Sequence, residues 1–174
     1  SLSSMAIKLA EKTVSLDNKT ILLVGVNKIN EQIAHYLHER RIQTVIVANR
    51  TFEKAVSIAR YLGGRAIHFD TFKKELHKVD IIICSTAAPH FILKREEVEA
   101  SLTKRTRPLL LIDMAVPRDI DPEIKQVTGV TLYSLDDFNH VIQENLGKKK
   151  TEALKAECLI KQAVEKMKTH APPI

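Results

Sequence analysis

The stretch TILLVGVNKIN, residues 20–30, decides the fold. A short apolar run ends at Gly25, and the apolar residues of the following segment, 29–40, recur at helical spacing. An apolar run of this length beside a glycine turn is typical of a strand buried on both faces. The stretch therefore predicts a strand, a tight turn and a helix, the first half of a βαβ unit.

The same alternation continues along the chain. Further apolar runs typical of strands lie at residues 44–48, 65–69, 79–84, 108–112 and 130–133, and helical patterns lie at 52–62 and 94–102, with a short helix starting near Pro122. Gly63-Gly64 ends the helix at 52–62 as a C-cap does. Strands that alternate with helices at this spacing are joined by right-handed crossovers. We therefore predict an α/β fold with a Rossmann-type, doubly wound, mostly parallel sheet.

Helical segments flank this pattern at both ends. Apolar residues at positions 2, 5, 6, 9 and 10 predict a leading helix, which a turn at 17–19 ends. Residues 135–169 predict one long C-terminal helix, broken only by Gly147. Its apolar members are Leu146, Leu154, Cys158, Ile160, Ala163, Val164 and Met167. Because such a helix has little core of its own, its apolar stripe indicates a partner surface.

Size and composition exclude several classes of protein. The chain has 174 residues, 44% hydrophobic and 28% charged, which fits one domain plus an appendage. No apolar run reaches the roughly 18 residues that cross a bilayer, so we expect a soluble protein without membrane contact. Cys84 and Cys158 show neither CxxC spacing nor a disulfide framework, which favours a reducing, cytoplasmic setting without a zinc site. Residues 148–168 hold seven lysines and three glutamates of a chain whose net charge is +6, which is more typical of a solvated helix face than of an RNA site.

The turn after the first strand reads G-x-N-x-x-N, where nucleotide-binding Rossmann turns read G-x-G-x-x-G. In such turns, backbone amides at the start of a helix face the pyrophosphate of a dinucleotide. Asn27 therefore places a side chain where the pyrophosphate approaches. One interpretation is a tight turn that binds nothing. The other is a phosphate turn made of Gly25, Asn27, Lys28, Ile29 and Asn30, with polar contacts replacing the lost glycines.

The end of the second strand reads Asn49-Arg50-Thr51. Enzymes that use NAD usually place an acidic residue here, on the ribose 2′-hydroxyl. An arginine flanked by small polar residues instead suits a 2′-phosphate, which favours NADP over NAD. The alternative is a solvated Arg50, with Thr51 capping the next helix.

Polar loops follow the fourth and fifth strands. Residues 85–90 read STAAPH, and residues 113–122 read DMAVPRDIDP. Both loops face the crevice at the carboxyl edge of the sheet, where ligands bind in open α/β folds. The alternative is that Ser85, Thr86, Asp113 and Asp119 only satisfy backbone groups or form turns.

Three stretches together resemble glutamyl-tRNA reductase: VANRT at 47–51, STAAPH at 85–90 and IDMAVPRDIDP at 112–122. Their order and spacing match as well, and the resemblance covers nearly the whole chain. Related Rossmann enzymes such as shikimate dehydrogenase share the Asn-Arg-Thr but not the Pro-Arg loop. The resemblance implies an oxidoreductase that uses NADPH to reduce glutamyl-tRNA to glutamate-1-semialdehyde, the committed step of tetrapyrrole (porphyrin and heme) biosynthesis.

The resemblance also implies a division of the chain. Residues 1–140 would form the NADP-binding domain with a leading linker helix, and residues 141–174 would begin the spine helix through which the family forms homodimers. The family's N-terminal catalytic domain, with its nucleophilic cysteine, would be absent, and glutamyl-tRNA would not be bound mainly by this domain. The opening SLSS, without an initiator methionine or a signal pattern, agrees with an excised fragment. We expect this fragment to be inactive alone.

Carried over by position, the resemblance places the contacts of NADPH. It assigns the phosphate turn to residues 25–30 and the 2′-phosphate pocket to Asn49, Arg50 and Thr51. Ser85, Thr86 and Ala87 would form the wall on the nicotinamide side, and Asp113, Ala115 and Pro117 would close the pocket. At positions 27 and 30 the family normally has glycine.

No catalytic or metal-ligating residues are expected in this chain. Cys84 lies at a strand end where the nucleophile of the family does not belong, and it is expected to be a buried structural thiol. His35 and His38 share a helix face but lack a third ligand. Two alternatives stay open: a degenerate Rossmann scaffold without nucleotide binding, and another small NADP-dependent dehydrogenase of shikimate type, whose substrate domain this chain has no room to encode.

Overall fold

A computed structural model describes residues 1–42 and 44–169, without the side chains of residues 142, 145 and 169. The chain divides into two compact units, Ser1–Phe138 and Asn139–Ile174. The first unit contains the sheet and every candidate site residue. In the described residues, no helix is long and apolar enough to span a membrane.

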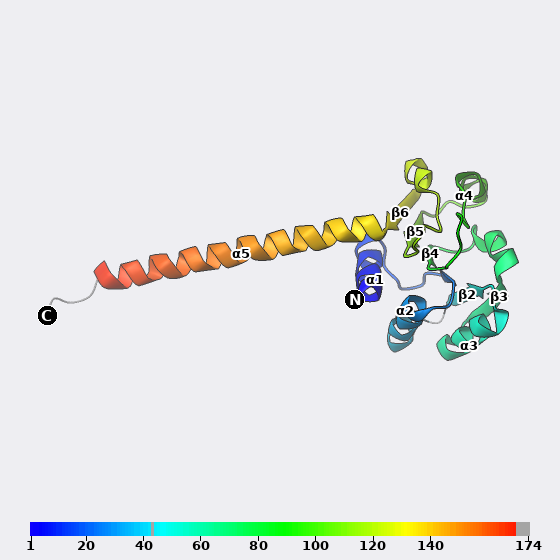
Figure 1. Cartoon of the computed structure of the whole chain (residues 1–174), viewed down its shortest axis with the longest axis horizontal. Helices are drawn as coiled ribbons and strands as arrows, with labels where there is room; N and C mark the ends of the chain where they lie inside the picture. Colours follow the sequence, from blue (N-terminus) through cyan, green and yellow to red (C-terminus); the bar gives the residue numbers. More distant parts are fainter. Residues whose placement is uncertain (43, 170–174) are drawn as a thin grey trace. The chain divides into compact units, whose positions relative to one another are not determined.

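The sheet of the first unit has six strands in the order β3-β2-β1-β4-β5-β6, and all neighbouring strands pair in parallel (Figure 1). Their bounds are β1 Ile21–Val24, β2 Val45–Asn49, β3 Arg65–His68, β4 Ile81–Cys84, β5 Leu109–Asp113 and β6 Val130–Ser134. The chain order reverses between β1 and β4, so a crevice forms there at the carboxyl edge. The predicted doubly wound Rossmann-type sheet is confirmed.

Helices cover both faces of this sheet because alternate side chains of each strand point to opposite sides. Leu23 belongs to one apolar cluster, with buried residues of α1, α2 and α3, and Leu22 belongs to a second cluster, with residues of η1, α4 and η2. The bounds of these helices are α1 Leu2–Thr13, α2 Lys28–Glu39, α3 Phe52–Leu62, η1 Phe69–Glu75, α4 Arg95–Leu102 and η2 Pro122–Gln126. Burial on both faces explains why the inner strands are apolar throughout.

The predicted element boundaries hold to within one or two residues. Helix α3 ends at Gly63, whose φ of +70° is the left-handed C-cap that the Gly63-Gly64 pair predicts. The third strand ends at His68, one residue earlier than expected, because η1 begins at Phe69. The short helix near Pro122 is a 3₁₀ helix, η2, with Asp121 as its side-chain cap.

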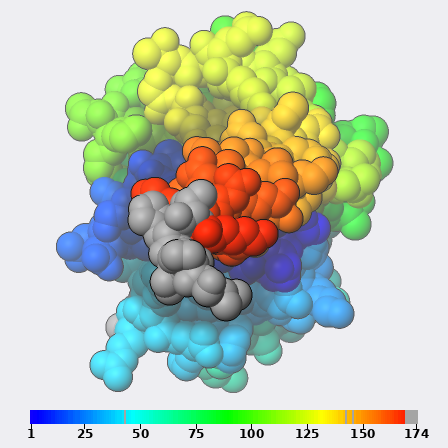
Figure 2. Space-filling view, turned by 90° about the vertical axis from the view of Figure 1, so that its left-hand side faces the viewer, coloured from blue at the N-terminus to red at the C-terminus, as the bar shows by residue number. Residues whose placement is uncertain are grey.

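Helix α5, Leu135–Thr169, runs through Gly147 without interruption, so the predicted break there is wrong. A single glycine in a helix costs only about 1 kcal/mol, which the flanking residues offset. Phe138, near the start of α5, is buried in the core of the first unit. From residue 146 to residue 168 the side chains of α5 are exposed (Figure 2, orange and red), including the apolar Leu146, Leu154, Ile160, Val164 and Met167.

Candidate functional site

Gly25 forms the sharp turn between β1 and α2. Its φ is +95°, and a Cβ at this position would lie 2.4 Å from the carbonyl oxygen of Ser85. Side chains rarely adopt such a φ, and no Cβ fits against a backbone oxygen at that distance. Glycine is therefore required here, because the turn passes directly over the loop that follows β4.

The two asparagines of the turn are both engaged in internal hydrogen bonds. Asn27 is the N-cap of α2: its Oδ1 accepts from the amides of Ile29 at 3.1 Å and Asn30 at 3.2 Å. Its Nδ2 donates to the carbonyl oxygen of Ser85 at 2.7 Å and to the Ser85 hydroxyl at 2.8 Å. Asn30 is buried, and its Nδ2 donates to the carbonyl oxygens of Val24 and Gly25. Each of these side chains thus bonds backbone groups of the turn.

The end of β2 and the turn after it contain the three residues that were expected to bind the 2′-phosphate. Asn49 links two turns, since its Oδ1 accepts from the amide of Val26 and its Nδ2 donates to the carbonyl oxygen of Thr51. The guanidinium of Arg50 lies 4.5 Å from the ring centroid of Phe69. Thr51 is the N-cap residue of α3, but its side chain makes no capping bond. The alternative in which Thr51 caps the helix through its side chain is therefore not observed.

Lys54 is a residue that the sequence interpretation missed. It lies four residues after Arg50 and lines the same cavity, and both side chains are exposed. Within residues 1–42 and 44–169, neither cation has a carboxylate within ion-pair distance. Two unpaired cations on one wall of a crevice favour a bound anion. The available signal was a second basic residue in the first turn of the helix that follows Arg50.

The loop after β4 is held by a buried carboxylate. Asp119 is fully buried, and its oxygens accept from the Thr86 amide at 2.8 Å and from the Thr86 hydroxyl at 2.5 Å. The Thr86 hydroxyl oxygen in turn accepts from the amide of Ala88. Burial raises the pKa of Asp119, although the bonds from Thr86 and the charge of Arg50 act in the opposite direction. Asp119 therefore positions the loop that faces Arg50.

The loop after β5 is organised from inside by Asp113. This carboxylate is buried and accepts hydrogen bonds from three backbone amides, those of Ala115, Asp119 and Ile120, at 2.9–3.0 Å. Burial raises its pKa against the effect of these bonds. Asp113 thus satisfies backbone groups, as the alternative interpretation held.

Two adjoining cavities make up the crevice. One, of about 390 Å³, contains eight of the expected residues: Gly25, Asn27, Asn49, Arg50, Thr51, Ser85, Thr86 and Ala87. Its wall also includes five residues that were not expected: Val26, Lys54, Phe69, Ala88 and Pro89. Six expected residues line neither cavity: Lys28, Ile29, Asn30, Asp113, Ala115 and Pro117.

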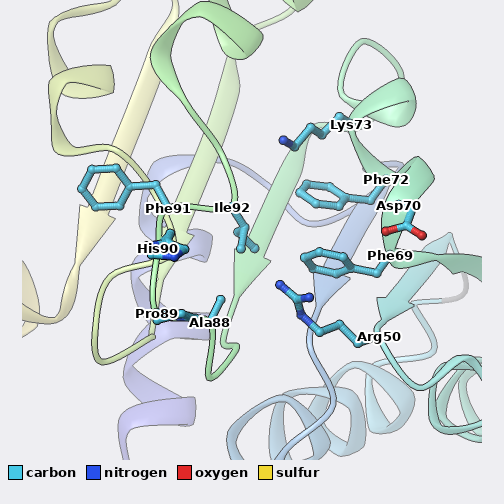
Figure 3. A pocket seen from close by; sticks show the side chains of 10 residues that line it. All are labelled: Arg50, Phe69, Asp70, Phe72, Lys73, Ala88, Pro89, His90, Phe91 and Ile92. Atoms are coloured by element: carbon cyan, nitrogen blue, oxygen red, sulfur yellow. The ribbon is translucent and has the colours of Figure 1, made fainter.

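The second cavity has a volume of about 320 Å³ and continues the first past Arg50 (Figure 3). The guanidinium of Arg50 points into the space between Phe69 and the loop of Ala88 and Pro89, and Phe72 lies deeper on the same side as Phe69. This slot is lined by six apolar residues and by Arg50, Asp70, Lys73 and His90. Aromatic walls beside cations suit a flat aromatic group that carries a phosphate.

Cys84, His35 and His38, which were not expected to bind a ligand, line neither cavity of the crevice. Cys84 is buried, and burial, with the nearby Asp119 and Asp113, raises the pKa of its thiol well above the usual range. His35 contacts the Tyr61 hydroxyl and Glu39, and His38 stacks on the Tyr61 ring at 4.3 Å. In the part of the chain that the structure describes, no cluster of three or more His, Cys, Asp or Glu could hold a metal ion.

The sequence of the unit that contains the crevice matches a known family. The sequence profile of the family described as Shikimate / quinate 5-dehydrogenase matches residues 8–141. The chain belongs to this family. Within the curated proteins, its relatives are glutamyl-tRNA reductases: that of Geotalea daltonii is 39% identical over 166 residues, which are 94% of this chain and 38% of that protein.

Solved structures of glutamyl-tRNA reductases resemble this chain as well. Glutamyl-tRNA reductase from Methanopyrus kandleri matches with a TM-score of 0.76 and 37% identity, over 97% of this chain and 43% of that one. The nucleotide binding domain of glutamyl-tRNA reductase from Thermoplasma volcanium shares the fold, with a TM-score of 0.65 at 22% identity, over 86% of this chain and 96% of that one. The predicted resemblance to glutamyl-tRNA reductase is confirmed, and it is favoured over the two alternatives. The chain spans about 38% of the length of the curated relative.

Proposed function

We propose that this chain is the NADPH-binding domain of a glutamyl-tRNA reductase, the enzyme that reduces glutamyl-tRNA to glutamate-1-semialdehyde in tetrapyrrole biosynthesis. The observation that carries the proposal is the pair of unpaired cations, Arg50 and Lys54, at the end of a β2 strand that lacks an acidic residue. A 2′-phosphate is the group that distinguishes NADPH from NADH, and such a pair of cations suits it.

The residues of the crevice would divide the work of binding. Arg50, Lys54 and Thr51 would hold the 2′-phosphate, and the slot beside Phe69 would take the adenine ring. Ser85, Thr86 and Ala87 would form the wall on the nicotinamide side, while Asp113, Ala115 and Pro117 would support the loop that closes it. NADPH supplies the hydride when bound, and this chain orients it while covalent chemistry takes place in another domain.

The division of the chain is part of the same proposal. Residues 1–140 would form the cofactor domain, and residues 141–174 would begin a spine helix whose exposed apolar stripe pairs with that of a second copy. Glutamyl-tRNA would be the substrate of the whole enzyme, which we place in the cytoplasm. Sedimentation equilibrium should then show association of the chain that increases with concentration, and a strict monomer at high concentration would overturn the dimer.

Calorimetric titration with NADPH and NADH tests the cofactor. We expect NADPH to bind at least tenfold more tightly, a difference of about 1.4 kcal/mol, and we expect Arg50→Gln to abolish this preference. Arg60→Gln is the matched control, because Arg60 is an exposed arginine in the last turn of α3, the helix that follows Arg50, and lines neither cavity of the crevice. Equal binding of the two nucleotides, or a preference that survives Arg50→Gln, would refute the assignment.

A further inference from the structure

The start of α2 is the part of the crevice where this chain departs most from a dinucleotide-binding turn. In such turns the amides of the first helical turn face the pyrophosphate. Here Asn27 Oδ1 already accepts from two of those amides, Ile29 and Asn30. The carboxamide is also held from its other end, because Nδ2 donates twice to Ser85. The side chain therefore occupies the hydrogen-bonding position that a pyrophosphate would take.

The backbone does not require this side chain. Asn27 has φ −147° and ψ −179°, an extended conformation that any residue adopts. A smaller residue would keep the turn, because Gly25 and not Asn27 makes the sharp bend. Substitution at position 27 would thus release the two amides without removing the crevice.

The opposite end of the crevice, after β2, presents exposed cations instead of capped amides. Arg50 and Lys54 are exposed, and in the described ranges neither has a carboxylate partner to displace. Their bonds to a phosphate would be charge-assisted, and such bonds are roughly twice as strong as neutral ones. A phosphate at the β2 end therefore meets exposed cations, whereas a pyrophosphate at the α2 end meets two amides, those of Ile29 and Asn30, that already have an acceptor.

We propose that Asn27 is a specificity-determining residue that stands in for the pyrophosphate, so that the crevice recognises chiefly a nucleoside 2′-phosphate. The proposal rests on the proposed function and refines it. A diphosphate adds little to the affinity of this chain, because it must displace the Asn27 carboxamide from Ile29, Asn30 and Ser85. Most of the affinity for NADPH comes from the end of the ligand that adenosine 2′-monophosphate also contains.

Calorimetry on the full 174-residue chain, with NADPH and adenosine 2′-monophosphate as separate ligands, tests the proposal. For the unsubstituted chain we expect the two affinities to lie within about fivefold of each other. Asn27→Gly should tighten NADPH about tenfold, or about 1.4 kcal/mol, and leave the monophosphate unchanged. Glycine is well tolerated as an N-cap, and Asn27→Ala serves as a second variant that frees the same amides. Ser1→Gly is the matched control, since it removes the side-chain cap of α1, outside the crevice.

The outcomes separate this inference from the proposed function. If the monophosphate binds and Asn27→Gly leaves NADPH affinity unchanged, or tightens both ligands equally, the role of Asn27 is refuted and the cofactor domain stands. If the unsubstituted chain binds NADPH a hundredfold more tightly than the monophosphate, the role of Asn27 is likewise refuted. If neither ligand binds any folded variant, the proposed function fails and the inference fails with it. Binding of NADPH only after Asn27→Gly supports the inference.

Discussion

Gly25→Ala offers a direct test of how closely the turn after β1 approaches the loop after β4. The φ of +95° at this residue costs a side chain about 1–2 kcal/mol. The new Cβ would also lie 2.4 Å from the Ser85 carbonyl oxygen and 2.9 Å from its carbonyl carbon, so one of the two backbones must move. Forced overpacking of this kind costs roughly 1–3 kcal/mol more. We therefore expect the free energy of unfolding to fall by about 2–5 kcal/mol, with a fall in Tm of roughly 4–20 °C for a chain of this size.

The assay is urea and thermal unfolding followed by circular dichroism. Gly129→Ala is a matched control, because Gly129 has a similar φ of +86° but nothing within 4 Å of its added Cβ. The control should lose only the cost of the positive φ, about 1–2 kcal/mol. If the two variants lose equal stability, the close approach between Gly25 and Ser85 contributes nothing and the reasoning is refuted.

Three further predictions concern the crevice, the sheet edge and the long helix. Lys54→Gln should weaken NADPH about threefold to tenfold and leave NADH unchanged, because a lysine acts as a point charge on the 2′-phosphate; an equal loss for both nucleotides, by calorimetry, would contradict its role. Burial alone would raise the pKa of Asp80, but bonds from the Thr20 amide and Arg107 lower it. A carboxylate with a lowered pKa stabilises the folded state above its unfolded-state pKa, about 3.9, and this stabilisation is lost as the pH falls through the folded-state pKa. In urea unfolding, Asp80→Asn should therefore lose most stability at pH 7 and less at pH 3. A loss of stability that does not change with pH would count against this prediction. Gly147→Ala should stabilise α5 by about 0.5–1 kcal/mol, seen as higher helicity at 222 nm on warming, and unchanged helicity would be the opposing result.

Much of the fold could be predicted because each element carries its own local signal. Helix α3 was predicted with the observed bounds, 52–62, since polar residues precede it and Gly63 terminates it. The predicted break at Gly147 was wrong because a local signal of about 1 kcal/mol is too weak to end a long helix. The strand order β3-β2-β1-β4-β5-β6 was not predicted from individual residues; it is the order of a doubly wound Rossmann-type sheet.

The candidate site was harder to predict than the fold. Position in the sequence placed Asp113 at the correct edge of the sheet but did not indicate that its carboxylate turns inward to three loop amides. Lys54 was missed because it lies in a helix with no motif of its own. Phe69 was missed because it was placed at the end of a strand, and only the fold brings it to Arg50, 19 residues away.

The sequence by itself determined the α/β alternation, the glycine turn after β1, the arginine after β2 and the resemblance to glutamyl-tRNA reductase. Each of these features is encoded by residues that lie close together along the chain. Only the tertiary structure decided which polar groups remain free to bind a ligand. Asn27 finds its partner in Ser85, 58 residues away, and Asp119 finds Thr86, 33 residues away, while Arg50 and Lys54 find no carboxylate in the described residues. A hydrogen bond depends on distance in space, and the fold alone determines which distant segments meet.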